Sequence, residues 1–318
     1  MIRRTPLFFH QPAVVQLVVL FLLVLCFWIV SFFLGVVLSR LFFGIPVLET
    51  LSGIAIPETR NEINLLKFMQ LINQFGTFLI PPFLFAFLVS TDIREYLGLQ
   101  KKPNLLPVLS AIILIYLLLP VINELVRINQ NMSLPSCLSA VEEWMRVSEM
   151  RAEKMTKAFM RTTSIKGLLI NLLIIGVLAA VGEELLFRAV LIRVFRSWFK
   201  SSNWAVIISA FIFSAFHLQF YGFLPRFLLG LVFGYLFVWS GSLFLPIIAH
   251  FINNASAVII SFLMNRGIIE VSVDEFGKVD NPILLIISII LSIALMYFIY
   301  WYEKKADGVY LKKDNTKA

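Results

Sequence analysis

The sequence has few charged residues for its length. Asp, Glu, Lys and Arg make up only 14% of its 318 residues, whereas 59% of the residues are hydrophobic. A soluble domain averages about 25% charged and about 45–50% apolar residues. The composition therefore argues against a soluble domain and favours a protein that lies in a membrane.

Cysteine is also scarce, and the basic residues form no patch. Cys26 and Cys137 lie in different segments without a CxxC spacing, which gives no support for a disulfide or a zinc knuckle. The net charge of +8 would suit nucleic acid, but the basic residues are scattered at the ends of predicted helices. We therefore expect no nucleic-acid partner and assign these charges to setting the membrane topology.

The apolar residues form long unbroken runs, such as AVVQLVVLFLLVLCFWIVSFFLGVVL near the N-terminus. Unpaired backbone groups in hydrocarbon cost several kcal/mol each, so a spanning segment is a helix or part of a closed barrel. Barrel strands would alternate apolar and polar residues. The first run is also too long for the core of a signal peptide, which has about 7–15 residues. The runs predict an all-α polytopic bundle with a retained first span.

Eight spans are expected, because about 20 helical residues cross a hydrocarbon core of about 30 Å. No internal repeat or low-complexity segment divides the chain, so residues 1–318 are predicted to form a single integral membrane domain. The expected spans are Ala13–Phe43, Met69–Ser90, Leu105–Leu125, Gly167–Phe195, Trp204–Phe220, Phe227–Trp239, Pro246–Leu263 and Ile283–Trp301.

Loop charges place both termini in the cytoplasm, because lysine and arginine favour the cytoplasmic side. The loop 265–281 is acidic and is expected outside, and the charged stretch 141–161 is expected to be an amphipathic helix on or beside the bundle. A cell membrane is the predicted location, most simply a bacterial inner membrane. The basic residues expected inside are Arg3, Arg4, Arg94, Lys101, Lys102, Arg193, Arg196, Lys200, Lys304, Lys305, Lys312, Lys313 and Lys317.

Ionisable residues within the fourth predicted span suggest a function. A charge at the bilayer centre costs at least about 2.5–3.5 kcal/mol, so such residues are functional candidates. Glu184 and Arg188 are spaced i,i+4 and share a helix face, which predicts an ion pair. Glu183 is then left as an unpaired carboxylate suited to general-base chemistry. A structural ion-pair cluster is the alternative reading of this segment.

Histidines in two further spans support a shared site. His217 lies in the fifth predicted span and His250 in the seventh, with Asn254 one helical turn after His250. A single membrane histidine is more often a hydrogen-bonding partner between helices. Two histidines beside a glutamate pair favour a catalytic cluster. Gly230 and Gly234 in the sixth span have a GxxxG spacing, which would allow close helix approach.

The segments EELLFR, FSAFH and HFINN, in this order, resemble the EExxxR, FxxxH and HxxxN motifs of the CPBP family. This family of intramembrane endopeptidases includes the type II CAAX prenyl proteases and bacteriocin-processing and immunity proteins. The resemblance covers residues 165–264, the expected peptidase core. It implies hydrolysis of a peptide bond in a membrane-associated peptide or lipidated protein.

The resemblance also implies a role for each motif residue. Glu183 would activate the attacking water with the help of His217, and His250 with Asn254 would stabilise the oxyanion. Glu184 and Arg188 would support the site as an ion pair. No cofactor is expected, although zinc held by Glu183, His217 and His250 remains an alternative. The HExxH motif of many zinc peptidases is absent.

Two other functions use the same residues. A proton-coupled transporter would employ the carboxylates and histidines as a proton relay, although no symmetric halves are visible. An immunity or scaffolding protein would act by binding alone. Membrane lipid and the peptide substrate are the expected partners of a peptidase.

Overall fold

The fold is given by a computed structural model that describes residues 5–44 and 59–314, with side chains as far as residue 305. Every regular element within these residues is helical. Seven helical runs among them are long and apolar enough to cross a membrane. The predicted all-α, multi-pass architecture is confirmed. These runs are Ala13–Phe43, Arg60–Val89, Leu105–Gln130, Ile165–Phe199, Phe220–Ser240, Phe244–Asn265 and Pro282–Lys305.

The fifth predicted span is shorter than expected. Helix α11 (Ser202–Phe216) has 15 residues, which extend for about 22 Å, less than the core of about 30 Å. It ends because the chain leaves helical geometry at Leu218, which has a positive φ of 52°. The 3-10 turn η5 (Phe220–Gly222) then leads directly into α12 (Phe223–Ser240). The prediction of a full span over Trp204–Phe220 was therefore wrong in length.

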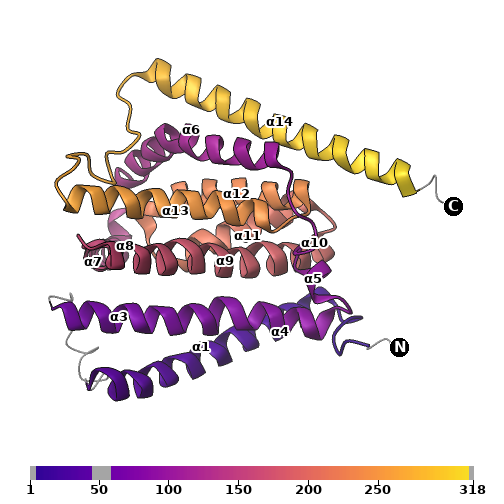
Figure 1. Cartoon of the computed structure of the whole chain (residues 1–318), viewed down its shortest axis with the longest axis horizontal. Helices are drawn as coiled ribbons and strands as arrows, with labels where there is room; N and C mark the ends of the chain where they lie inside the picture. The colour runs from indigo at the N-terminus through magenta and orange to yellow at the C-terminus, as the bar shows by residue number, and fades with distance from the viewer. Residues whose placement is uncertain (1–4, 45–58, 315–318) are drawn as a thin grey trace.

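Four helical runs form the middle of the bundle, and two pairs flank them (Figure 1). The central runs are α11, α12, α13 (Phe244–Asn265) and the composite fourth span, Ile165–Phe199. On one side lie α6 (Leu105–Gln130) and α14 (Pro282–Asp314). On the other side α1 (Ala13–Phe43) packs against α3 (Arg60–Asn73) and α4 (Ile80–Val89). The predicted motif residues all lie in the central group.

Helix α1 begins and α14 ends at the same end of the bundle (Figure 1). At this end the amide of Phe8 donates to Leu88 O over 2.9 Å, and Lys101 forms an ion pair with Glu303 at 3.6 Å. The short helix α5 (Ile93–Tyr96) also lies here. Because α1 begins and α14 ends at the same end, the chain passes along the bundle an even number of times. Helix α11 counts as one of these passes, since it reverses the chain direction despite its short length. The cytoplasmic assignment of this end stays a prediction.

The structure shows where several of the basic residues lie on which the cytoplasmic assignment rests. Residues 93–102 and the end of α14 that carries Lys304 and Lys305 lie at this common end. Arg3, Arg4 and Lys317 lie outside the described residues, as do the side chains of Lys312 and Lys313.

The charged stretch that follows α6 forms helix α7 (Ser139–Met160), which lies across the opposite end of the bundle (Figure 1). Asn265 of α13 donates from Nδ2 to Met160 O over 3.1 Å, and Asn171 donates likewise to Phe159 O over 3.0 Å. The helix also contacts η5, where the Trp144 and Phe220 rings lie 5.8 Å apart. Helix α7 therefore covers the end at which α11 gives way to α12.

Helices α11 and α12 approach closely along the predicted glycine motif. A Cβ added to Gly230 would lie 2.9 Å from the Ala210 Cβ, and one added to Gly234 would lie 2.7 Å from Val206 Cγ1. Both distances are too short for real side chains, so these positions must lack a Cβ for the helices to pack as they do. The close approach predicted from the GxxxG spacing is confirmed.

Three segments of the spans have π-helical rather than α-helical turns. They are η1 (Gln74–Leu79), η3 (Leu172–Leu178) and η4 (Glu184–Leu191). Segments η3 and η4 interrupt the fourth span on either side of α9 (Ala179–Glu183). Such turns are rare and occur frequently at functional sites. All three of them pack around α9, which carries the predicted base.

Candidate active site

The centre of the site is a buried group of three charged or polar side chains. Arg188 Nη1 lies 3.0 Å from Glu184 Oε1, which confirms the predicted ion pair. The same carboxylate oxygen accepts a hydrogen bond from His250 Nδ1 over 2.8 Å. All three side chains are almost fully buried. Glu184 thus joins the fourth span to α13 through one oxygen atom.

Aromatic rings enclose this group. The Arg188 guanidinium lies over the Phe213 ring at 4.4 Å and over the Phe233 ring at 5.4 Å. Phe233 also stacks on the His250 imidazole, with ring centroids 5.0 Å apart and an angle of 18° between the planes. Cation–π contacts are strongest where water is excluded. The rings therefore stabilise the arginine charge and fix the plane of the imidazole.

Glu183 lies at the more open side of the buried group. Its Oε2 is 3.8 Å from His250 Nε2, the ring nitrogen that Glu184 does not contact, and its side chain is 13% exposed. Because Nδ1 of His250 donates to Glu184, the second nitrogen is directed at Glu183. The two neighbouring glutamates thus contact opposite nitrogens of one imidazole.

His217 caps the C-terminal end of α11, directly after Phe216. Its Nδ1 donates to Phe213 O over 2.8 Å, since a carbonyl oxygen can only accept. A neutral His217 therefore carries its free lone pair on Nε2. The Phe213 ring lies 5.1 Å from the His217 ring and 6.2 Å from the His250 ring, so one phenyl group separates the two imidazoles. His217 also lies within electrostatic range of Glu183.

Asn254 contacts the fourth span from α13. Its Nδ2 donates to Ile175 O in η3 over 3.0 Å, and its Oδ1 accepts from Asn253 Nδ2 over 3.1 Å. The π-helical turn leaves the Ile175 carbonyl free to accept this hydrogen bond. In that turn the Ala179 amide donates to Ile174 O, five residues back, and not to Ile175 O. One amide proton of Asn254 remains for another acceptor.

The structure thus brings Glu183, Glu184, Arg188 and His250 into one cluster and places His217 and Asn254 on the helices around it. A family model described as type II CAAX prenyl endopeptidase Rce1-like matches residues 165–256. Over these residues the predicted resemblance to the CAAX prenyl protease family is confirmed. All six predicted site residues lie within the Rce1-like segment.

A curated relative matches over a similar length. It is an uncharacterized 24.3 kDa protein of Escherichia coli, 37% identical over 100 residues. These residues are 30% of this chain and 46% of the relative, so the chain spans less than half the length of the relative that it matches. No solved structure matches the chain.

The expected zinc alternative can be compared with the geometry of the Rce1-like segment. Among residues 5–44 and 59–305, whose side chains the structure describes, no three His, Cys, Asp or Glu side chains come together as a metal-binding group. Nδ1 of His250 donates to Glu184 and Nδ1 of His217 donates to a backbone carbonyl, which leaves Nε2 of both rings available. Glu183, His217 and His250 nevertheless do not come together as a metal-binding group.

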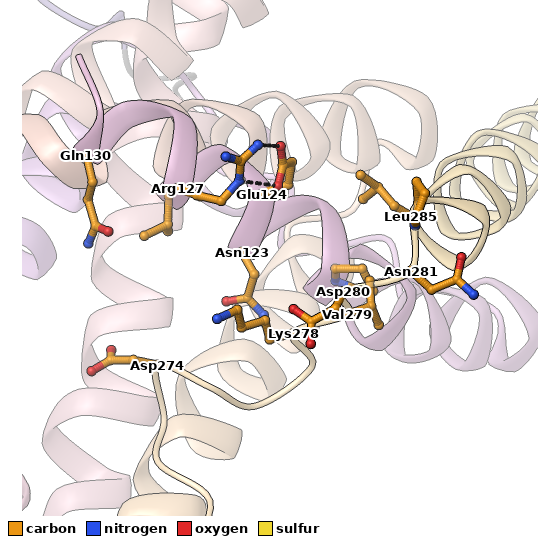
Figure 2. Close-up of a pocket in the computed structure, with 13 residues that line it drawn as sticks. Asn123, Glu124, Arg127, Gln130, Asp274, Lys278, Val279, Asp280, Asn281 and Leu285 are labelled. Atoms are coloured by element: carbon orange, nitrogen blue, oxygen red, sulfur yellow. Dashed lines mark hydrogen bonds and ion pairs between the residues drawn. The ribbon is translucent and has the colours of Figure 1, made fainter.

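A cavity of about 520 Å³ lies away from this site, between the end of α6 and the loop before α14 (Figure 2). Arg127 and Glu124 pair there, with Nε 2.8 Å from Oε2. Asn123 donates from Nδ2 to Phe276 O over 3.0 Å. Its lining contains none of the six predicted site residues.

Two residues near the cluster were missed from the sequence. Phe233 stacks on His250 from α12, and no sequence motif pointed to this contact, because the glycine spacing around it faces α11 and not α13. Arg226 lies within electrostatic range of both Glu183 and His217. It stands one residue before the expected start of the sixth span at Phe227, and a lone arginine in an apolar helix is itself a functional signal.

Proposed function

We propose that this protein is an intramembrane endopeptidase that hydrolyses a peptide bond in a membrane-associated peptide or lipidated protein. The observation that carries the proposal is the position of His250 between Glu184 and Glu183. It places a proton acceptor, Glu183, beside an imidazole whose orientation is fixed by a buried ion pair. The Rce1-like segment supports the same reaction class.

Water activation is assigned to Glu183 and His217. Glu183 takes a proton from the attacking water, while the free Nε2 of His217 accepts a hydrogen bond from the same water. A positioned general base contributes about 10²–10⁴-fold to a rate. The resulting hydroxide attacks the carbonyl carbon, and Glu183 later passes its proton to the leaving amine.

Oxyanion stabilisation is assigned to His250 and Asn254. Because Nδ1 of His250 donates to Glu184, its Nε2 donates to an oxyanion only when the ring is an imidazolium. With two carboxylates, one guanidinium and one imidazolium the buried cluster would carry no net charge. The remaining amide proton of Asn254 supplies a second donor.

The deciding experiment compares wild type with Glu183→Gln after reconstitution in vesicles. Both are incubated with a pool of peptides that includes prenylated C-termini, with and without a strong chelator. We expect cleavage by wild type only, and unchanged cleavage in chelator. Loss of wild-type activity in chelator would establish a metal requirement. Proton flux into vesicles that depends on Glu183, without any cleavage, would instead identify a transporter.

The cellular location and membrane orientation are part of the same proposal. We place the protein in a cell membrane with both termini in the cytoplasm, because basic residues gather at the end where α1 begins and α14 ends. Cysteine accessibility at Lys102→Cys, in the loop before α6, tests this in a protein whose exposed Cys26 and Cys137 have been replaced by Ser. Labelling by an impermeant reagent only after cell lysis is expected.

A further inference from the structure

Arg226 is a cation at the site whose charge has no partner of opposite sign in direct contact. Its Nη2 donates to Gln219 Oε1 and its Nη1 donates to Gln219 O over 3.3 Å. No ion pair between Arg226 and a carboxylate is found in the described part of the chain. Both acceptors are neutral groups, and they hold the guanidinium without neutralising it.

The chain provides a fixed position for this guanidinium. Gly222 lies beneath it, and a Cβ added there would lie 2.8 Å from Arg226 Cζ and 3.0 Å from its Nη2. Any other residue at this position would displace the group. Gln219, Gly222 and Arg226 thus form a small cradle where η5 joins α12, in the apolar run Phe220–Ser240.

The cradle begins at Gln219, two residues after His217. Arg226 is within electrostatic range of Glu183 and His217, and also of Glu149 on α7. Glu149 Oε2 accepts a hydrogen bond from the Tyr221 amide over 3.3 Å, which attaches α7 to the same turn. The cradle therefore follows His217 closely in the chain and lies at the turn that α7 contacts.

We propose that Arg226 binds a carboxylate of the substrate, held near the scissile bond on the side that faces α7. The inference rests on the proposed peptidase function and adds a specificity-determining residue to it. A guanidinium presents parallel N–H groups that match the two oxygens of a carboxylate. A cation within an apolar span is costly unless an anion or polar groups stabilise it. The carboxylate comes from the chain terminus or from an acidic side chain.

Binding to non-cleaving protein tests this without requiring turnover. Reconstituted Glu183→Gln is incubated with three pools of the same peptides, prenylated members included. One pool ends in a free carboxylate, the second in a carboxamide, and the third in a carboxamide that follows an Asp. We expect about 10- to 100-fold tighter retention of a carboxylate pool than of the plain amide pool, as for hydrogen bonds to charged groups.

Arg226→Gln in the same background is expected to abolish that preference and leave retention of the amide pool unchanged. Arg226→Lys should keep part of it, and Arg127→Gln, at a distant surface ion pair, should keep all of it. Preference for the free terminus or for the Asp pool identifies the source of the carboxylate.

Equal retention of all three pools by the Glu183→Gln protein would overturn the proposal. So would an equal loss of all pools in Arg226→Gln, because a purely structural role predicts that result. Failure of wild type to cleave would count against the peptidase function alone, since the binding preference is measured separately.

Discussion

His250 and Glu184 lie 66 residues apart in the chain and share a buried hydrogen bond of 2.8 Å from Nδ1 to Oε1. The contact fixes which ring nitrogen faces Glu183. It also ties the orientation of the imidazole to the Glu184–Arg188 ion pair, since both partners use the same oxygen. Stability and activity should therefore respond differently to changes in this trio.

Glu184→Leu should destabilise the protein by about 3–5 kcal/mol, because it leaves the Arg188 charge buried and unpaired. Adding Arg188→Met should recover most of that loss, because a buried pair replaced by apolar groups is often neutral or stabilising. Activity should stay absent in both variants, since His250 loses its partner. Unfolding in denaturant and peptide cleavage are the two measurements. Recovery of activity in the double variant would contradict the role of Glu184.

His217→Asn should reduce kcat by about 100-fold, as for a small misplacement of a reacting group. Asparagine can still donate to Phe213 O from the position of Nδ1, but it offers nothing at the position of Nε2. The unfolding free energy should therefore change little. Steady-state kinetics beside thermal unfolding checks both statements. Full activity in this variant would remove His217 from water activation.

Gly230→Ala should destabilise the bundle by about 1–3 kcal/mol, the usual cost of overpacking. The new methyl group would meet Ala210, including its Cα at 3.1 Å, and a backbone atom cannot move aside. Gly234→Ala meets the side chain of Val206 instead, so Val206→Ala should relieve it. The denaturant midpoint is measured for Gly230→Ala and Gly234→Ala, each alone and combined with Val206→Ala. Equal rescue of both glycine variants by Val206→Ala would contradict the packing described for α11 and α12.

Docking of α7 should weaken as pH rises. Burial raises the pKa of the Glu149 carboxyl above its ordinary value of 4.5, and Glu153 adds to this, whereas Arg226 and the Tyr221 amide act in the opposite direction. A raised carboxyl pKa means that the docked state binds the proton more tightly. Docking is therefore strongest below 4.5 and loses free energy as pH rises through the raised value.

Hydrogen exchange of the α7 amides across that range, corrected for the intrinsic pH dependence, measures the effect. Glu149→Gln should remove the pH dependence, because glutamine keeps an acceptor for the Tyr221 amide without a titrating group. Glu143→Gln, an exposed position on the same helix, is the matched control. A pH dependence that persists in Glu149→Gln would assign it to another group.

The sequence was sufficient for the features that depend on spacing along one helix. The Glu184–Arg188 pair follows from i,i+4 geometry, and the approach of α11 to α12 from the glycine spacing. Contacts between helices could not be predicted from the sequence in the same way. Nothing in the motif order determines that His250 donates to Glu184 instead of Glu183, because that depends on how α13 is rotated against the fourth span.

The length of α11 and the π-helical turns could not be predicted from the sequence for a different reason. Hydropathy is the same whether an apolar segment is α-helical or π-helical, so η3 and η4 leave no mark in composition. The apolar run continues past Phe216 to Phe220, which concealed the turn at Leu218. Arg226 was not predicted as a site residue because the expected sixth span, Phe227–Trp239, begins after it.

The π-helical segment η4 has a consequence for how this span tolerates change in length. A π-helical turn holds one residue more than an α-helical turn, so deleting a residue within Glu184–Leu191 would convert it to regular helix. Everything beyond the deletion would keep its sequence and nearly its orientation relative to Glu183, because the lost residue is the one that the wide turn holds in excess. A deletion in a regular α-helical part of the same span would instead rotate everything beyond it by about 100°. The fourth span therefore tolerates the loss of one residue within η4 better than in the α-helical segments on either side.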